Sequence, residues 1–216
     1  MPKDFERPED KSILEDREAA GLWKAIALSK EIGESERPID LGVILELHKK
    51  MFGDAMPEIA GRFRKAGEDV KKLTCIEPPF GSVVEEKMHG FEKDMAFRMA
   101  SVSGRPDPKH KKHYRQWVES VFDLAAWTQH HLVAIHPFCE GNGRVARLMT
   151  NIVLRRFHMP PTDVKIESEN KPKYISALCQ IDNHQDYGPL RDMLLRGSIA
   201  TLKMEKEKRQ KKQASI

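Results

Sequence analysis

The chain has 216 residues, of which 39% are hydrophobic and 32% are charged, and its formal net charge at pH 7 is +4. This length supports one sizeable domain with its own core and leaves little room for a second. No stretch is long and apolar enough to cross a membrane, and the N-terminus carries no apolar secretory segment, so we expect a soluble cytoplasmic protein with no membrane partner.

The three cysteines are Cys75, Cys139 and Cys179. They are odd in number, far apart and form no CxxC pair, so their spacing predicts neither a disulfide framework nor a zinc ribbon. Such use of cysteine is typical of a reducing compartment, which agrees with the cytoplasmic expectation.

The first third of the chain predicts two helices followed by a loop. Apolar residues recur at the helical period over residues 10–32, and residues 33–40 form a linker. Asp40 can cap a second helix, in which Val43, Ile44, Leu47 and Met51 are spaced three and four apart. Residues 52–69 are rich in glycine and charge and predict a loop.

Residues 70–83 are the one strand candidate. Thr74, Cys75 and Ile76 favour extended backbone, and the pair Pro78 and Pro79 excludes a helix. We therefore predict a short β-hairpin or an extended flap at this place.

The remainder predicts helices. Segments with helical periodicity cover residues 83–101, 112–135, about 144–157, 171–182 and 186–203, and the apolar stripe of the second is broad. The basic run at residues 203–213 is interpreted as a solvated helix end or a frayed terminus, and it has no aromatic residues among its cations, which argues against nucleic acid as a partner. The sequence therefore predicts an all-α fold with one small β element.

The sixteen residues 134–149, AIHPFCEGNGRVARLM, place polar and flexible chemistry between two apolar segments. Gly141 and Gly143 flank Asn142 where a helix begins, and the first amides of a helix attract anions such as phosphate. Arg144 and Arg147 are three apart, so both can reach phosphate oxygens on one side of that helix.

Two further residues of this stretch complete a candidate catalytic site. Glu140 would repel a polyphosphate unless a cation lies between them, and Mg²⁺ binds carboxylates together with phosphates. His136 can accept a proton at neutral pH and is therefore a candidate general base. Each feature alone is more often structural, and only the combination indicates a site.

The segment HPFCEGNGRVAR resembles the signature of the Fic family, HPFx(D/E)GNGRxxR, at every specified position. Residues 48–64, 75–83 and 174–178 are also similar to segments of that family. The resemblance implies a Fic-type helical bundle with a β-hairpin flap. It divides the chain into an N-terminal helical extension at 1–40, a Fic domain at 41–200 and a basic tail at 201–216.

The resemblance also implies an activity, the transfer of AMP from ATP and Mg²⁺ to a Ser, Thr or Tyr hydroxyl of a target protein, with release of pyrophosphate. By position, His136 is the base, Glu140 holds the metal, and the segment from Gly141 to Gly143 forms the anion cradle. Arg144 and Arg147 contact the outer phosphates, and family members that act as kinases carry Lys in place of Gly143. The flap residues that would dock the target by strand addition are Leu73, Thr74, Cys75 and Ile76.

Several alternatives stay open at this point. The same site could remove AMP from proteins, transfer UMP or phosphocholine, or bind nucleotide without turnover. A metal hydrolase built on His131, His136 and Glu140 fits poorly, since zinc ligands usually lie on regular elements. Many family members block ATP binding with a glutamate, and Glu15 and Glu205 are imperfect candidates for it. An inhibitory partner chain and a homo-oligomer also remain open.

Overall fold

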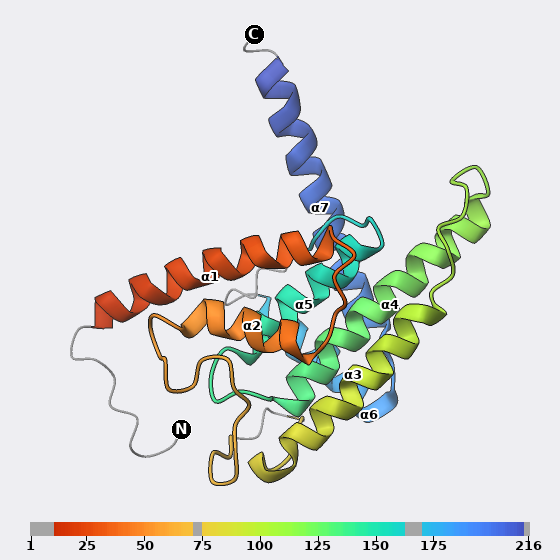
Figure 1. The fold of residues 1–216 in the computed structure, drawn as a ribbon. Coiled ribbons are helices and arrows are strands. Elements are labelled where there is room, and N and C mark those ends of the chain that lie inside the picture. The colour runs from red at the N-terminus through yellow and green to blue at the C-terminus, as the bar shows by residue number, and fades with distance from the viewer. Residues whose placement is uncertain (1–10, 71–74, 163–169, 214–216) are drawn as a thin grey trace.

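The computed structural model describes residues 11–70, 75–162 and 170–213, and within these ranges it is helical (Figure 1). The elements are α1 (Lys11–Gly33), α2 (Leu41–Phe52), the 3₁₀ helix η1 (Gly81–Val83), α3 (Val84–Ser101), α4 (Lys111–Ile135), α5 (Asn142–Arg156), α6 (Lys171–His184) and α7 (Gly188–Gln213). The prediction of an all-α fold is thus confirmed. The described part of the chain contains no helix that is long and apolar enough to cross a membrane.

The β-hairpin flap is not confirmed. Among the described residues there is no sheet, and Ile76 forms an isolated β-bridge in otherwise irregular backbone. Leu73 and Thr74 lie outside the described residues. The segment ends in η1 rather than in a second strand, because Gly81 starts a single tight turn that leads directly into α3.

The core is centred on α4 and α5, which pack against each other more extensively than any other pair of helices. In Figure 1, α4 runs beside α3, and α1 lies across α5 and α2. The middle of α4 is buried on almost every side, as expected for a helix with neighbours on several faces. This pair matters for function because the short loop between the two helices, residues 136–141, holds much of the candidate site that the sequence predicts.

The start of α2 shows how local sequence fixes an element that later supports the site. Asp40 is extended, and its Oδ1 accepts a hydrogen bond from the Val43 N–H at 3.0 Å, as predicted for an N-cap. The apolar face of α2 then buries Ile44, Leu47 and Met51. His48 lies on the same buried side, where a polar side chain needs hydrogen-bond partners.

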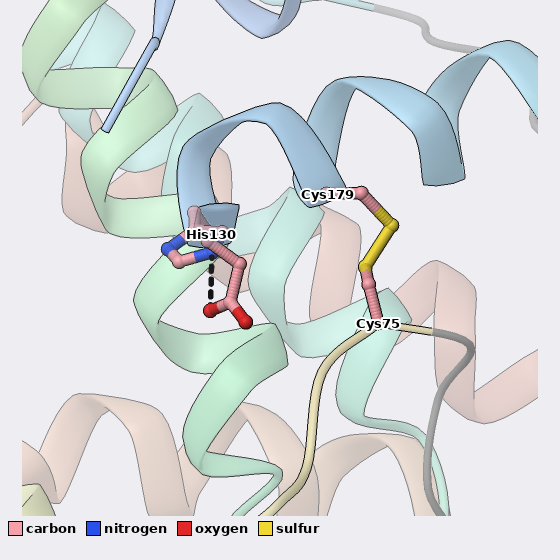
Figure 2. Close-up of a disulfide and its surroundings, with 4 residues drawn as sticks. Cys75, His130 and Cys179 are labelled. Atoms are coloured by element: carbon pink, nitrogen blue, oxygen red, sulfur yellow. Dashed lines mark ion pairs between the residues drawn. A yellow bond between two sulfur atoms is a disulfide. The ribbon is translucent and has the colours of Figure 1, made fainter. Parts of the chain in front are cut away.

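The cysteine prediction was wrong. Cys75 and Cys179 form a disulfide with their Cα atoms 5.6 Å apart, which joins the segment before η1 to α6 (Figure 2). Cys139 is free and half-buried. The two paired residues are 104 positions apart in the chain, and only the fold brings them together. The bond also removes the cysteine argument for a reducing compartment.

The last helix extends far beyond the bundle. α7 is continuous from Gly188 to Gln213, and its final turns project away from the other helices (Figure 1). Side chains from Leu202 to Lys211 are exposed to solvent. The basic run is therefore a solvated helix end, while the division of the chain at residue 201 stays a prediction.

Candidate functional site

The candidate site is built on the loop that joins α4 to α5. His136 ends α4 in the left-handed conformation, with φ 51° and ψ 58°, and its N–H donates to the Leu132 carbonyl at 3.1 Å. Asn142 closes the loop, because its side chain accepts from the Phe138 N–H at 2.8 Å and donates to the Phe138 carbonyl at 2.7 Å. Both Phe138 and Asn142 are buried, so the loop is anchored in the core.

Gly141 must be a glycine for two independent reasons. Its φ is +79°, and a Cβ at this position would lie 2.3 Å from Cε2 of Phe52. It is the N-cap of α5, and its carbonyl accepts the first helical hydrogen bonds, from Arg144 and Val145, at 3.0 Å each. The amides of Asn142 and Gly143 precede those bonds, so they are available to an anion at the positive end of the helix dipole.

The imidazole of His136 is suited to accept a proton. Its Nδ1 lies 3.3 Å from the Val133 carbonyl oxygen. Because a carbonyl only accepts hydrogen bonds, this contact requires the proton on Nδ1 and leaves the lone pair on Nε2. Burial, reinforced by the nearby charge of Arg64, lowers the pKa of His136, so the ring is neutral at pH 7.

Two arginines of α5 lie beside the loop. The Nη1 of Arg144 donates to Oε2 of Glu18 on α1 at 2.8 Å, and its guanidinium stacks over the ring of Phe52 at 4.7 Å. Arg147 leans toward the start of the helix, since a Cβ on Gly143 would lie 3.4 Å from its Nη1. Both predicted phosphate-contacting side chains therefore reach the N-terminal end of α5.

Glu140 lies at the same place and is 43% exposed. Its Oε1 accepts from the Gly141 N–H at 3.0 Å and is 3.5 Å from Nη2 of Arg144. Within the described ranges, no group of three or more His, Cys, Asp or Glu side chains could hold a metal by itself. A single accessible carboxylate fits Mg²⁺, which completes its coordination with substrate phosphates and water.

Sequence reasoning missed three residues that contact this loop or the first turn of α5. His48 accepts the Gly61 N–H on Nδ1 at 2.9 Å, so its Nε2 carries the proton that it donates to the Glu140 carbonyl at 3.1 Å. Its ring stacks on Phe138 at 3.8 Å, and burial lowers its pKa to about 4. Its place on the apolar stripe of the predicted second helix was a usable signal for such a role.

The other two missed residues come from distant parts of the chain. Arg64 donates from Nε to the His136 carbonyl at 2.7 Å, and its own N–H donates to the Pro137 carbonyl at 2.9 Å. Glu18 forms the ion pair with Arg144 that is described above. Glu18 lies outside every segment that resembles the family, and Arg64 is the last residue of one such segment, 48–64, in which nothing local distinguishes it.

The remaining predicted site residues are Glu15, Glu205 and the flap residues. Glu15 is exposed on α1, one turn before Glu18. Glu205 is exposed on α7 and interacts electrostatically with Arg155, at the opposite end of α5 from the loop. Of the predicted flap residues, Cys75 is held by the disulfide and Ile76 is buried.

Comparison with known proteins identifies relatives that align with most of this chain. Residues 38–154, more than half of the chain, match the family model described as Fic/DOC family. Over 180 residues the chain is 32% identical to a protein adenylyltransferase Fic of Nematostella vectensis, which covers 83% of this chain and 37% of that protein. The chain spans about a third of the length of the curated relatives that it matches.

Two solved structures share the architecture. Residues 134–508 of Fic-1 from Caenorhabditis elegans align with a TM-score of 0.66 at 25% identity, covering 95% of this chain and 55% of that one. A Fic-domain-containing signalling protein from Bacteroides thetaiotaomicron aligns with a TM-score of 0.71 at 21% identity, covering 92% of this chain and 74% of that one. The second likeness bears on the fold alone.

Proposed function

Because this chain belongs to the Fic/DOC family, we propose that it is a protein adenylyltransferase, which transfers AMP from ATP to a Ser, Thr or Tyr hydroxyl of a target protein. The observation that carries the proposal is that a neutral imidazole and a cationic helix start flank the same short loop. His136 and the first turn of α5 are separated only by a loop of five residues, 137–141. Relatives named protein adenylyltransferase at 30% identity or above support the same activity.

In the proposed reaction, His136 at one end of the loop acts as the base, and the start of α5 at the other end binds the phosphates. Nε2 of His136 takes the proton of the target hydroxyl, whose oxygen forms a bond to the α-phosphorus of ATP. The bond from that phosphorus to the bridging oxygen of the β-phosphate breaks, and pyrophosphate leaves with the electron pair. The amides of Asn142 and Gly143, together with Arg144 and Arg147, neutralise the charge that develops on the leaving group.

Glu140 is the proposed magnesium ligand. Mg²⁺ bound there with phosphate oxygens would supply positive charge and would orient the polyphosphate for in-line attack. The hydrogen bond from the Gly141 amide and the proximity of Arg144 aim this carboxylate at the helix start.

We also propose that the target docks along residues 73–76 by strand addition, through backbone hydrogen bonds. Ile76 already takes part in a β-bridge, which supports an extended backbone at that residue. Such docking depends little on side chains of the target, so it leaves the identity of the target open to experiment.

The test is an incubation of the pure chain, Mg²⁺ and a cell lysate with α-³²P-ATP, and in parallel with γ-³²P-ATP. We expect protein label from the α position only. His136→Ala should lose it while its far-ultraviolet circular dichroism is retained, and His184→Ala, an exposed histidine at the end of α6, is the matched control. Label from the γ position, or an undiminished signal in His136→Ala, would refute the proposal.

A further inference from the structure

Arg64 is the largest side chain that the described core buries completely, with 0% of the side chain exposed. Burying a guanidinium is costly unless its donors find acceptors, so its contacts reveal what the fold gains from it. The residue lies in the loop after α2, far in sequence from the motif. Its neighbour Arg62 is partly exposed and pairs with Glu68 at 2.7 and 2.8 Å, as a surface arginine would.

The first set of Arg64 contacts is to the end of α4. Nε donates to the His136 carbonyl at 2.7 Å, and Nη2 donates to the Ile135 carbonyl at 3.3 Å. These belong to the last carbonyls of the helix, which lack helical partners and carry the negative end of its dipole. The guanidinium therefore caps α4 at the residue that is proposed as the catalytic base.

The second set of contacts is to the segment that ends the proposed docking flap. Nη2 of Arg64 also donates to the Pro79 carbonyl. Nη1 lies 3.7 Å from Oδ1 of Asp69, and the same oxygen accepts the Gly81 N–H at 2.7 Å. Gly81 packs so tightly on the backbone of Lys65 that a Cβ there would be 1.9 Å from the Lys65 carbonyl oxygen.

We propose that Arg64 is a positioning residue for the transfer reaction, which fixes the flap root, residues 79–81, relative to His136. One planar group donates to both segments, so the distance between the docked target and the base depends on it. The inference rests on the proposed function, because it needs His136 as the base and the flap as the docking site. It adds a residue outside the motif that touches neither nucleotide nor target.

The proposal predicts that loss of Arg64 lowers the rate of transfer and leaves nucleotide affinity unchanged, whereas a general loss of structure would lower both. The nucleotide site is formed by α5 and Glu140, which Arg64 does not contact, so affinity for a non-hydrolysable ATP analogue should be unchanged in Arg64 variants. Transfer to a target should fall, because the hydroxyl and the base are no longer held in register. Misplacement by about 1 Å costs on the order of 100-fold in rate.

The experiment compares the wild-type chain, Arg64→Ala, Arg64→Lys and the matched control Arg62→Ala. Target labelling from α-³²P-ATP should fall about 100-fold in Arg64→Ala and less in Arg64→Lys, which keeps the charge and some donors. Free guanidinium at millimolar concentration should restore part of the activity of Arg64→Ala and none of that of His136→Ala. Arg62→Ala should label targets like the wild type.

Hydrogen exchange provides a readout that does not depend on activity. In both Arg64 variants, peptides covering residues 75–83 and 133–138 should lose protection together, while peptides of α5 should keep it. Normal labelling by a folded Arg64→Ala or Arg64→Lys would overturn the proposal. Parallel loss of nucleotide binding and labelling, or exchange that rises throughout the chain, would also overturn it. Absence of α label from the wild type refutes the proposed function instead, and the exchange pattern still decides whether Arg64 joins the two segments.

Discussion

The Cys75–Cys179 disulfide leads to a prediction about stability whose size follows from the fold. The bond links residues 104 positions apart, and constraining a loop of that length in the unfolded chain stabilises the folded state by about 4.7 kcal/mol. Unfolding of 216 residues carries an entropy of about 2 cal/mol/K per residue, so this free energy corresponds to about 10 °C in Tm. Reduction of the wild type should therefore lower Tm by about that amount.

The assay is thermal unfolding followed by circular dichroism, with and without a phosphine reductant. Thiol titration in denaturant should find one thiol before reduction and three after it, because Cys139 is free. Cys179→Ser should melt like the reduced wild type and should no longer respond to reductant, whereas Cys139→Ser should behave like the wild type. If the thiol counts show the bond and Tm is nevertheless unchanged by reduction, the loop-closure reasoning is wrong.

Three further predictions concern two buried histidines, His48 beside the motif loop and His130 on α4, and the side chains of the site. Burial lowers the pKa of His48 and His130 to about 4. As the pH falls below about 6.5, the unfolded chain therefore binds protons at these residues before the folded chain does, and each residue should lower the free energy of unfolding by about 3 kcal/mol by pH 4. A free energy of unfolding in urea that stays constant between pH 7 and 4 would contradict this. Glu18→Gln removes the ion pair with the partly exposed guanidinium of Arg144, which is worth about 1 kcal/mol. An ATP analogue should therefore bind about fivefold more tightly, as measured by calorimetry. Weaker binding would mean that Glu18 orients Arg144 for phosphate. In Gly141→Ala the new Cβ would clash with Phe52 at a backbone φ that is positive, so the free energy of unfolding in urea should fall by about 3 kcal/mol. Gly143→Ala should leave the free energy of unfolding unchanged or raise it by up to about 1 kcal/mol. Equal effects of the two substitutions would refute the geometry of the cradle.

The helices could be predicted because their signals are local. Periodicity and the Asp40 cap placed α2 correctly, and α1, α3 and α4 begin and end within one or two residues of their predicted bounds. α5 starts at Asn142 rather than near Arg144, because Gly141 can adopt the left-handed conformation that caps the helix two residues earlier. The flap signal was weaker, since β-propensity without a visible partner strand does not specify pairing.

The missed contacts are all long-range. Arg64 and His136 are 72 residues apart, and Glu18 and Arg144 are 126 residues apart. Nothing in the spacing of such residues indicates that a loop and a helix end will meet. Their side-chain types are also common on protein surfaces, so only burial distinguishes Arg64 from Arg62.

The hydrogen bonds of the motif loop explain why its supports come from elsewhere. A buried loop leaves backbone groups that no helix or sheet satisfies, and each must find a partner. The carbonyls of His136 and Pro137 bond to Arg64, and that of Glu140 bonds to His48. Asn142 satisfies both the N–H and the carbonyl of Phe138. The bonds to Arg64 hold the base, and those to His48 and Asn142 hold the segment that carries the anion-binding amides. Because the chain's own groups make these bonds, binding energy need not be spent on ordering either part of the site. The residues that hold the loop are therefore as necessary to the proposed transfer as those that face the phosphates.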